Sequence, residues 1–579
     1  MADEQPPLST PHSRWNATAW LTTHPFFALI VGVVTIFGGG ISLYQIVSDN
    51  QLTELQESKR VIANRVANLA NLVDNCRVSV PQSVVAPIST VPPVPPASER
   101  DLRVLAQIHD ALMKEDYGTL VQNYQDPAIQ QYPFAQYQLG RFYASGYGVE
   151  KNYAEARRWF EKAAAQDHDC AQYALAEFYF IGLGVPVDYQ RARLWYEKSA
   201  AHDNACAQYV LGLIYENGWG VEKDYEQARL WHEKSAAQDS SASQYMLGIY
   251  YHNGWGVDQS YRKAKMWFER AAAQDSSAAQ YMFGIYYQQG WSVDQNYGEA
   301  KTWFEKSASQ NDQYAQYGLG TLYMEGSGVE RNYVEAKSWF EKAAAQGQRE
   351  AQYLLAIHYQ NGWGVSRNYK EAKAWFEKSA SQNDQYSQHA LGVLYLEGWG
   401  VERDYKKAKA WFEKSASQGD QYAQYYLGFL YMEGWGIDQN YEEAKSWFLK
   451  ASLQGNQDAQ YELGLLYMEG WGVGQNYEES KSWFDKAAAQ GNQYAQYELG
   501  ALYLNGWGVG RDYAQARSCF EKAAAQSHSE AQFGLGVLYE NGWGVTRNIG
   551  LALSWMRTAA RNGNEQAKKW VSTHRRYRT

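Results

Sequence analysis

The stretch AQYVLGLIYENGWGVEKDYEQARLWHEKSAAQ, residues 207–238, recurs along this chain every 36 residues with substitutions but without a gap. Counting Ala207 as position 1, the repeats start at Ala135, Ala171, Ala207, Ser243, Ala279, Ala315, Ala351, Ser387, Ala423, Ala459, Ala495 and Ala531. Twelve units therefore cover residues 135–566, and a fixed period of this length is typical of repeat architectures.

The first half of each unit has the pattern of a short helix. Ala207, Leu211 and Ile214 lie at helical spacing and form one apolar face. Gly212 interrupts that helix at a cost of about 1 kcal/mol relative to Ala, which suggests that a partner helix approaches closely there. Gly218 and Gly220 then end the helix, because glycine adopts the left-handed conformation common at helix C-termini.

The second half predicts another helix that packs back on the first. It opens at Asp224, whose counterparts are Asn, Asp or Ser and serve as N-caps. Glu or Gln often follows three residues later, as Gln227 does, which predicts a capping box. Trp231 and the other tryptophans at position 25 are expected on the core face of this helix.

One helix pair cannot bury its apolar face alone, so neighbouring pairs are expected to stack. The sequence therefore predicts an all-α protein, an α-solenoid of antiparallel helix pairs. Variable residues at position 4 of the repeat are the candidate partner-selecting positions: Met246, Met282, Leu354, Tyr426, Glu462 and Glu498.

The repeat frame A-Q-Y-x-L-G-x-x-Y-x-x-G-x-G-V-x-x-[ND]-Y-x-x-A-x-x-W-F-E-K-A-A-A-Q resembles the Sel-one-like repeat, a relative of the tetratricopeptide repeat. The resemblance covers residues 135–566 and implies a right-handed solenoid that acts as an adaptor or scaffold. It implies roles in membrane-associated assemblies, protein quality control, bacterial signalling or host interaction, with no shared catalytic residue. Unlike the cysteine-bridged secreted members, these repeats have no cysteine pair inside any unit.

Charge and cysteine content narrow the function classes. The 579 residues include 53 Lys or Arg and 63 Asp or Glu, a formal net charge of −10, which argues against nucleic acid as a partner. Basic residues at position 23 usually precede a glutamate by four residues, as Arg229 precedes Glu233, which indicates a solvated structural face. Cys170 and Cys206 occupy the same position in adjacent units and are expected to be free thiols.

The N-terminal region predicts a membrane anchor. Residues 1–24 form a polar tail, and residues 25–47 carry no charge and are long enough to cross a bilayer. A cleaved signal peptide is the alternative, but no clear cleavage site follows. We expect a single-pass protein of the bacterial inner membrane, and the charges nearest the segment slightly favour a cytoplasmic solenoid.

The segments around the repeats have distinct patterns. Residues 49–76 contain apolar residues in two heptad series over 52–76, which predicts a coiled coil and a parallel homodimer; a single amphipathic helix on the membrane or the solenoid is the alternative. Residues 77–100 form a Pro-rich linker. Residues 101–134 are expected to be a degenerate capping repeat. Residues 567–579 predict a basic C-terminal cap helix, with anionic lipid or an acidic partner as the alternative contact.

Histidines provide the test for catalysis, and the seven in the repeats fall at mostly inequivalent positions. None forms a recurring metal-spaced pair with Cys, Asp or Glu, and the Gly-x-Gly elements end helices instead of following strands. We therefore predict no enzyme activity, no cofactor and no metal.

The least generic feature is tryptophan at position 13 of the repeat, between two glycines. One interpretation is a structural ladder in which each indole packs on a neighbouring turn. The other is an exposed edge that binds peptide, glycan or another solenoid, because aromatic side chains are favoured binding anchors. These candidate edge residues are Trp219, Trp255, Trp291, Trp363, Trp399, Trp435, Trp471, Trp507 and Trp543.

Together these patterns predict a membrane-anchored scaffold that binds protein partners through its solenoid surface. One alternative is a cell-envelope protein that binds glycan, peptidoglycan or peptide through the tryptophan edge. The other is a membrane sensor in which ligand binding to the solenoid acts on the anchor.

Overall fold

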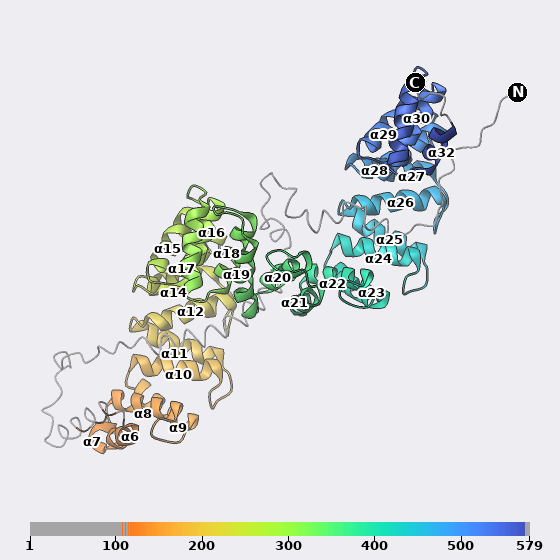
Figure 1. Ribbon diagram of the computed structural model, residues 1–579. Helices are drawn as coiled ribbons and strands as arrows, with labels where there is room; N and C mark the ends of the chain where they lie inside the picture. The colour runs from red at the N-terminus through yellow and green to blue at the C-terminus, as the bar shows by residue number, and fades with distance from the viewer. Residues whose placement is uncertain (1–106, 108–110, 112–113, 115, 574–579) are drawn as a thin grey trace. The chain divides into compact units, whose positions relative to one another are not determined.

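The computed structural model describes residues 107, 111, 114 and 116–573 (Figure 1). The expected polar tail, membrane segment, coiled coil and Pro-rich linker lie outside the described residues, as do residues 574–579. The described chain divides into two parts, and the boundary along the sequence falls between Arg331 and Asn332. Each part is a stack of helices, and the described residues contain no strand.

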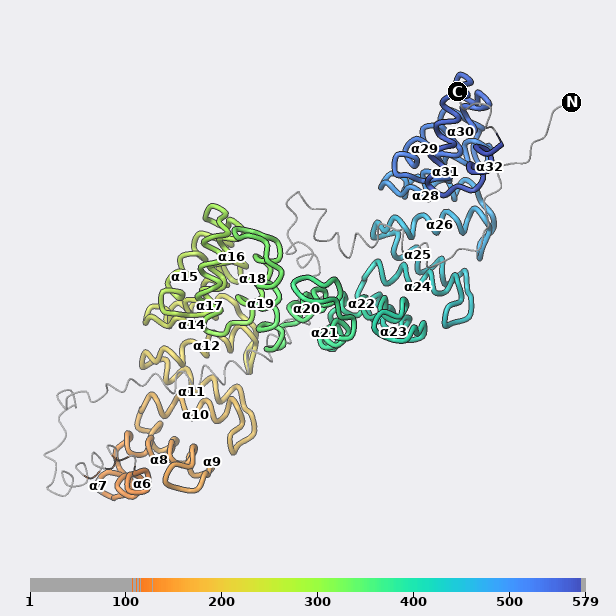
Figure 2. Tube along the Cα trace, viewed as in Figure 1, coloured from red at the N-terminus to blue at the C-terminus, as the bar shows by residue number. Residues whose placement is uncertain are grey.

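In the part that ends at Arg331, two short helices precede the repeating helix pairs. Within each repeat the chain runs along one helix, turns and returns along the next (Figure 2). The helices are α6 (Tyr117–Gln125), α7 (Pro127–Gln130), α8 (Pro133–Ser145), α9 (Tyr153–Ala164), α10 (Asp169–Ile181), α11 (Tyr189–Ala201), α12 (Ala205–Asn217), α13 (Tyr225–Ala236), α14 (Ser241–Asn253), α15 (Tyr261–Ala273), α16 (Ser277–Gln289), α17 (Tyr297–Ser309) and α18 (Gln313–Glu325).

The part that begins at Asn332 repeats the same hairpin and closes with a single helix. Its helices are α19 (Tyr333–Ala345), α20 (Arg349–Asn361), α21 (Tyr369–Ser381), α22 (Gln385–Glu397), α23 (Tyr405–Ser417), α24 (Gln421–Glu433), α25 (Tyr441–Leu453), α26 (Gln457–Glu469), α27 (Tyr477–Ala489), α28 (Gln493–Asn505), α29 (Tyr513–Ala525), α30 (Ser529–Asn541), α31 (Ile549–Arg561) and α32 (Glu565–Thr573).

We call the even-numbered helices from α8 to α30 the A helices and the odd-numbered helices from α9 to α31 the B helices. Within each part, an A helix packs on the B helix of its own repeat and on the B helix of the preceding repeat. This stacking buries the apolar faces that a single pair would leave exposed. The chain is therefore an all-helical repeat solenoid.

The turn between the two helices has the expected structure at the end of the A helix, but its hydrogen bonding differs from the expected one at the start of the B helix. Gly218 ends α12 with a φ of 73°, and both Gly218 and Trp219 donate their N–H groups to the carbonyl of Ile214. Asp224 caps α13 through its side chain. The N–H of Asp224, however, donates to the carbonyl of Tyr215 on α12, so this donor is satisfied by the A helix and not by a capping-box side chain.

The core of each helix pair centres on position 26 and not on the tryptophan at position 25. Phe268 is fully buried, whereas the preceding Trp267 is half-buried. The glycine at position 6 admits the ring: a Cβ on Gly248 would lie 2.4 Å from Cε1 of Phe268. Trp231 and its equivalents, which the sequence places on the core face, do pack against the core clusters, but at their margin, and Trp159 among them is buried.

The pairing of charges on the B helices is confirmed. Lys337 bonds Glu341 and Lys373 bonds Glu377, each at 2.6 Å and four residues apart. Cys170 and Cys206 form no disulfide among the described residues, as expected, and neither does Cys519. None of the described helices has the length and apolar character that a membrane span needs.

Candidate functional site

The tryptophans at position 13 lie in the turns between the A and B helices, and we call this set the turn edge. Eight of the nine are flanked by two glycines, and Trp291 by Gly290 and Ser292; all of these flanking residues adopt the left-handed conformation. Gly220, which follows Trp219, has a φ of 66°, and a Cβ there would lie 2.8 Å from the backbone N of Gln190. The turn therefore approaches the start of the preceding B helix closely, although the equivalent position in one repeat holds Ser292.

Every tryptophan of the turn edge stacks on the tyrosine that opens the B helix of the preceding repeat. Ring centroids are 5.4 Å apart for Trp255 and Tyr225, and the planes differ by 26°. The nine centroid distances run from 5.1 to 6.1 Å; the other pairs are Trp219–Tyr189, Trp291–Tyr261, Trp363–Tyr333, Trp399–Tyr369, Trp435–Tyr405, Trp471–Tyr441, Trp507–Tyr477 and Trp543–Tyr513.

The indole rings of these tryptophans are neither fully buried nor fully exposed to solvent. Trp471 is 37 % exposed, and the other eight are partly buried. Several also meet an aromatic ring of their own A helix edge to face, as Trp291 meets Tyr286. Contacts of this kind contribute about 0.5–1.5 kcal/mol beyond area burial. The tryptophans therefore connect successive repeats while part of each ring stays at the surface.

The side chains at position 4 are largely covered. Met246, Leu354, Tyr426, Glu462 and Glu498 are each less than a tenth exposed, and Met282 is partly buried. The position faces the B helix of the preceding repeat: the ring of Tyr426 stacks on Phe412 at 4.9 Å. A partner lying on this structure would therefore reach most of these side chains only at their edges.

Two of these covered positions hold carboxylates. Burial, together with the charges of Asp458 and Glu433, raises the pKa of Glu462 to about 8. Burial likewise raises the pKa of Glu498 to about 8, with the charges of Glu469 and Glu530 adding to the effect. Oε2 of Glu498 has no hydrogen-bond partner among the described residues. Both groups therefore favour the protonated form at neutral pH.

Ten of the eleven tryptophans at position 25 have a cation above the ring. The Nζ of Lys378 lies 3.5 Å from the ring centroid of Trp375, and the Nζ of Lys306 lies 3.7 Å from that of Trp303. This cation–π contact stabilises the exposed face of a half-buried indole. The B helices therefore present tryptophan and lysine together on their outer side.

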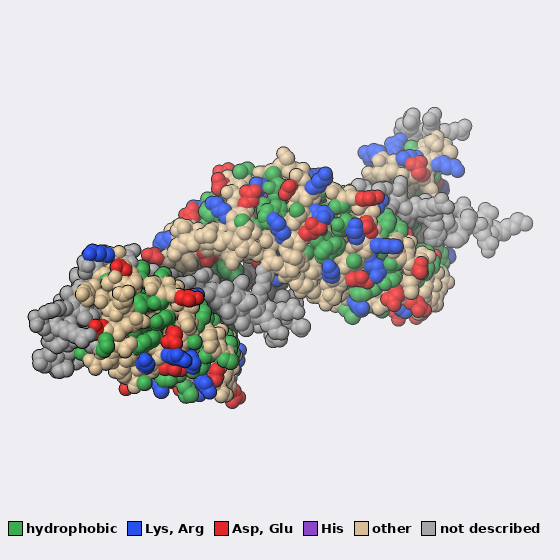
Figure 3. All heavy atoms as spheres, turned by 90° about the horizontal axis from the view of Figure 1, so that it is seen from below, with side chains coloured by type: hydrophobic (Ala, Val, Ile, Leu, Met, Phe, Trp, Pro, Cys, Tyr) green, Lys and Arg blue, Asp and Glu red, His purple; other side chains and the backbone are tan. Residues whose placement is uncertain are grey.

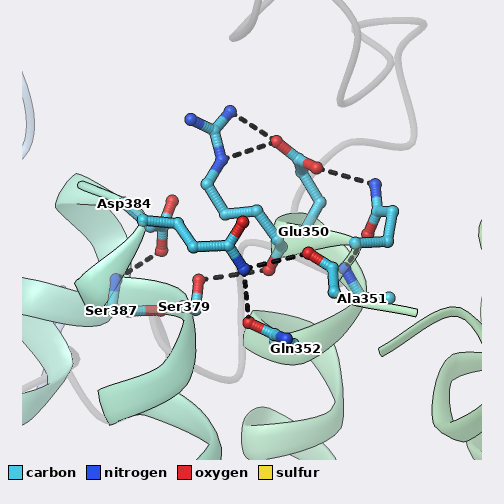
Figure 4. A network of polar contacts seen from close by, with 10 residues as sticks. Glu350, Ala351, Gln352, Ser379, Asp384 and Ser387 are labelled. Atoms are coloured by element: carbon cyan, nitrogen blue, oxygen red, sulfur yellow. Dashed lines mark hydrogen bonds and ion pairs between the residues drawn. The ribbon is translucent and has the colours of Figure 1, made fainter. Parts of the chain in front are cut away.

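A ladder of buried glutamines joins the repeats, and the sequence reasoning missed it. Gln352 on α20 donates through Nε2 to the carbonyl of Ala344 in the preceding repeat at 3.1 Å. Its Oε1 accepts from Nε2 of Gln382 at 2.8 Å. Figure 4 shows Gln352 in this network near Ser379, whose Oγ donates to the carbonyl of Arg349. The recurrence of Gln at positions 2 and 32 could have revealed it.

One group of side chains could hold a metal ion in the part of the chain that the structure describes. His168, Asp169 and Cys170 follow one another at the start of α10, and their ligand atoms lie within 4.8 Å of one another. Nδ1 of His168 already accepts from the N–H of Ala171 as the cap of this helix, at 3.2 Å. Burial raises the pKa of the Cys170 thiol to about 11, which opposes formation of the thiolate that binds metals.

Comparison with known proteins assigns the repeats. The family model described as Sel1 repeat matches twelve segments: residues 133–168, 171–204, 207–240, 241–276, 277–312, 313–348, 349–384, 385–420, 421–456, 457–492, 493–528 and 529–564. No curated protein matches the chain significantly.

Two solved structures resemble the chain. The first is c5321, a protective antigen present in uropathogenic Escherichia coli strains and displaying an SLR fold. It is 35 % identical, and the alignment covers 73 % of this chain and 91 % of that one with a TM-score of 0.66. The second is a Sel1 repeat protein from Oxalobacter formigenes, 33 % identical over 53 % of this chain and 89 % of that one, with a TM-score of 0.45.

Proposed function

Because this chain belongs to the Sel1 repeat family, we propose that it is a non-catalytic scaffold that binds protein partners along the surface of its solenoid. In this proposal residues 25–47 anchor the scaffold in a membrane. Residues 52–76 join two chains in parallel, and the Pro-rich linker holds the repeats away from the bilayer.

The observation that carries the proposal is where the repeats differ from one another. The interior recurs: position 26 is Phe in nine of the twelve units, and position 6 is Gly in ten. The surface varies: the exposed position 24 is Leu194, Leu230 and Met266 in three successive B helices but Ala374 and Ala410 in others. A constant core with a varied exterior is the arrangement expected of a recognition surface.

The exposed faces are mixed in character, which suits protein partners. Hydrophobic side chains occur in patches among acidic and basic ones on the face seen in Figure 3. Protein-binding surfaces typically combine apolar anchors with a polar surround. Long stacks of repeats supply such surfaces over many helices.

Photo-cross-linking tests the scaffold. A photoreactive amino acid placed at Ala374 or at Ala410 in the full-length chain, expressed in its own host, should form light-dependent adducts with specific proteins. Purified adduct proteins should then bind the chain directly in a titration. A set of such probes around both faces of the B and A helices that yields no protein adduct would overturn the proposal.

The membrane part has its own test. Deleting residues 25–47 should move the protein from the membrane fraction to the soluble fraction. Ser292→Cys in a chain whose own cysteines are replaced then reports the side: labelling of intact cells by an impermeant maleimide places the repeats outside, and labelling only after lysis places them in the cytoplasm. Membrane retention without residues 25–47 would contradict the anchor.

A second candidate function rests on the turn edge. Nine partly exposed tryptophans recur at one place in the repeat, and stacked aromatic side chains bind sugar rings and peptides well. We infer that a cell-envelope protein with this edge would bind glycan, peptidoglycan or peptide there. Replacing Trp435, Trp471 and Trp507 by Leu should then abolish sedimentation with purified peptidoglycan, and unchanged sedimentation would exclude this function.

A further inference from the structure

The A helices near the C-terminal end carry only acidic charges. Five of them, α22, α24, α26, α28 and α30, contain no Lys or Arg. Their eight acidic residues are Glu397, Glu433, Asp458, Glu462, Glu469, Glu498, Glu530 and Glu540. In the same repeats the B helices carry the lysines, as Lys409 on α23 does. The B helices also carry acidic residues such as Glu413, so only the A helices of these repeats have acidic side chains without Lys or Arg.

Helices α24, α26, α28 and α30 bring several of these carboxylates together. Helix α26 contacts α28, and α28 contacts α30. Besides burial, the pKa of Glu462 on α26 is raised by the charge of Asp458 on the same helix and by the charge of Glu433 on α24. Glu498 on α28 is influenced by Glu469 on α26. We call the six residues Glu433, Asp458, Glu462, Glu469, Glu498 and Glu530 the acidic face.

The groups that act on the two buried carboxylates are all acidic or phenolic. Besides burial, the charges of Glu469 and Glu530 raise the pKa of Glu498. The charge of Glu498, together with burial, in turn raises the pKa of Tyr461 and of Tyr497. Glu462 acts on Tyr425 and Tyr461. From the B helices, position 4 meets the apolar ring at position 26, as Gly534 meets Phe520. No Lys or Arg is among these influences within the described residues; Nδ1 of His528 lies 3.6 Å from Oε2 of Glu530, and burial lowers the pKa of His528 to about 4.

A second observation indicates that the acidic face accepts a ligand. Glu498 is only 8 % exposed, and its Oε2 has no hydrogen-bond partner among the described residues. An unpaired buried polar atom is costly, and the large majority of buried polar atoms in proteins have a hydrogen-bond partner. Among the described residues, no three side chains of the acidic face lie close enough together to share a metal ion.

We propose that the acidic face of α24, α26, α28 and α30 binds a basic segment of a partner protein, whose Arg or Lys side chains lie among these carboxylates. The partly exposed Glu469 and Glu530 and the exposed Glu433 make the first contacts. The buried Glu462 and Glu498 ionise as a guanidinium approaches, and Oε2 of Glu498 gains the charge-assisted hydrogen bond that it lacks. This inference rests on the proposed scaffold function and names the partner class.

Binding should release protons, because the cation stabilises the ionised form of groups whose pKa is about 8 in the free protein. Affinity should therefore rise as the pH increases from 6 to 8.5. An arginine segment is the better probe, since arginine does not titrate in this range.

The experiment measures anisotropy of a fluorescein-labelled peptide of alternating Arg and Ser, mixed with the full-length chain at about 150 mM salt, where the Debye length is about 8 Å. The variant is Glu462→Gln with Glu498→Gln. The matched control is Glu442→Gln with Glu478→Gln, which removes the same charge from exposed positions on the B helices.

We expect the wild-type chain and the control to bind the peptide several-fold more tightly at pH 8.5 than at pH 6. The acidic-face variant should bind at least tenfold more weakly at pH 8.5, with little pH dependence. Equal loss in variant and control would overturn the inference, because the net charge of −10 would then explain the binding. So would absence of binding. Protein adducts in the photo-cross-linking experiment would leave the scaffold function intact in either case.

Discussion

His232 occupies the place in its repeat that phenylalanine takes in most others. Its side chain is fully buried, and neither ring nitrogen has a hydrogen-bond partner among the described residues. Burial lowers the pKa of His232 to about 3. A buried polar group without a partner destabilises the fold by about 1–3 kcal/mol, so this one residue weakens an otherwise uniform core.

His232→Phe should therefore raise the free energy of unfolding by about 1–3 kcal/mol, because the ring fits the space beside Gly212 that Phe268 fills beside Gly248. In the unfolded chain His232 takes up a proton near pH 6.5, whereas in the folded chain it stays neutral down to about pH 3. The folded state therefore loses stability relative to the unfolded state as the pH falls from 6.5 to 3. Chemical denaturation at pH 5 and pH 8 measures both effects. The reciprocal Phe268→His should be destabilising; a neutral result there would contradict the explanation.

Glu462 and Glu498 have the opposite kind of pKa shift to His232, because burial keeps them protonated to a higher pH than in the unfolded chain. Their pKa values are raised to about 8, so the folded chain holds protons that the unfolded chain releases near pH 4.5. Their contribution is fully present below pH 4.5 and is lost as the pH rises through about 8. Melting temperatures of the wild-type chain should fall between pH 6 and pH 9, and Glu462→Gln with Glu498→Gln should flatten that slope. Parallel slopes would exclude these two residues as the cause.

At the scale of the helix and its turn, local signals predicted the boundaries well. The left-handed Gly218 and the N-cap Asp224 lie where the sequence placed them. The capping box was wrong, because the donor it would satisfy is taken by the carbonyl of Tyr215. A tertiary hydrogen bond between two helices replaced a local one, and local spacing contains no information about that contact.

Gly220→Ala tests the close approach of the turn to the preceding repeat. The new Cβ would lie 2.8 Å from backbone atoms of Tyr189 and Gln190, and the residue would keep a φ of 66°. We expect a loss of about 1–3 kcal/mol in the free energy of unfolding. Gly474→Ala is the control, since nothing lies within 4 Å of a Cβ there. Similar losses from both variants would show that the contact is unimportant.

A double-mutant cycle measures the stacking of the turn edge. Trp543 and Tyr513 lie 5.6 Å apart with an interplanar angle of 18°. Trp543→Ala, Tyr513→Ala and the double variant should give a coupling energy of about 0.5–1.5 kcal/mol by chemical denaturation. A coupling near zero would mean that the tryptophans do not stabilise the stack, which would favour the binding interpretation of the turn edge.

At the scale of the molecule, the period of 36 residues predicts that whole repeats are interchangeable. Deleting residues 387–422 removes one repeat and joins equivalent positions, so the shortened chain should stay helical and unfold cooperatively. Deleting only residues 392–401 leaves a broken hairpin and should disrupt the stack. Circular dichroism and melting curves distinguish the two, and equal damage from both deletions would contradict a modular array.

The sequence by itself determined the repeat period, the two helices of each unit, the glycine that ends the first and the cap that begins the second, because these depend on residues a few positions apart. Only the tertiary structure decided that Phe268 is fully buried while Trp267 packs at the margin of the core, that Trp255 stacks on Tyr225, and that Glu498 lies covered between repeats. Those outcomes depend on the orientation in which one helix pair packs against the next. Contacts between residues 30 or more positions apart determine that orientation.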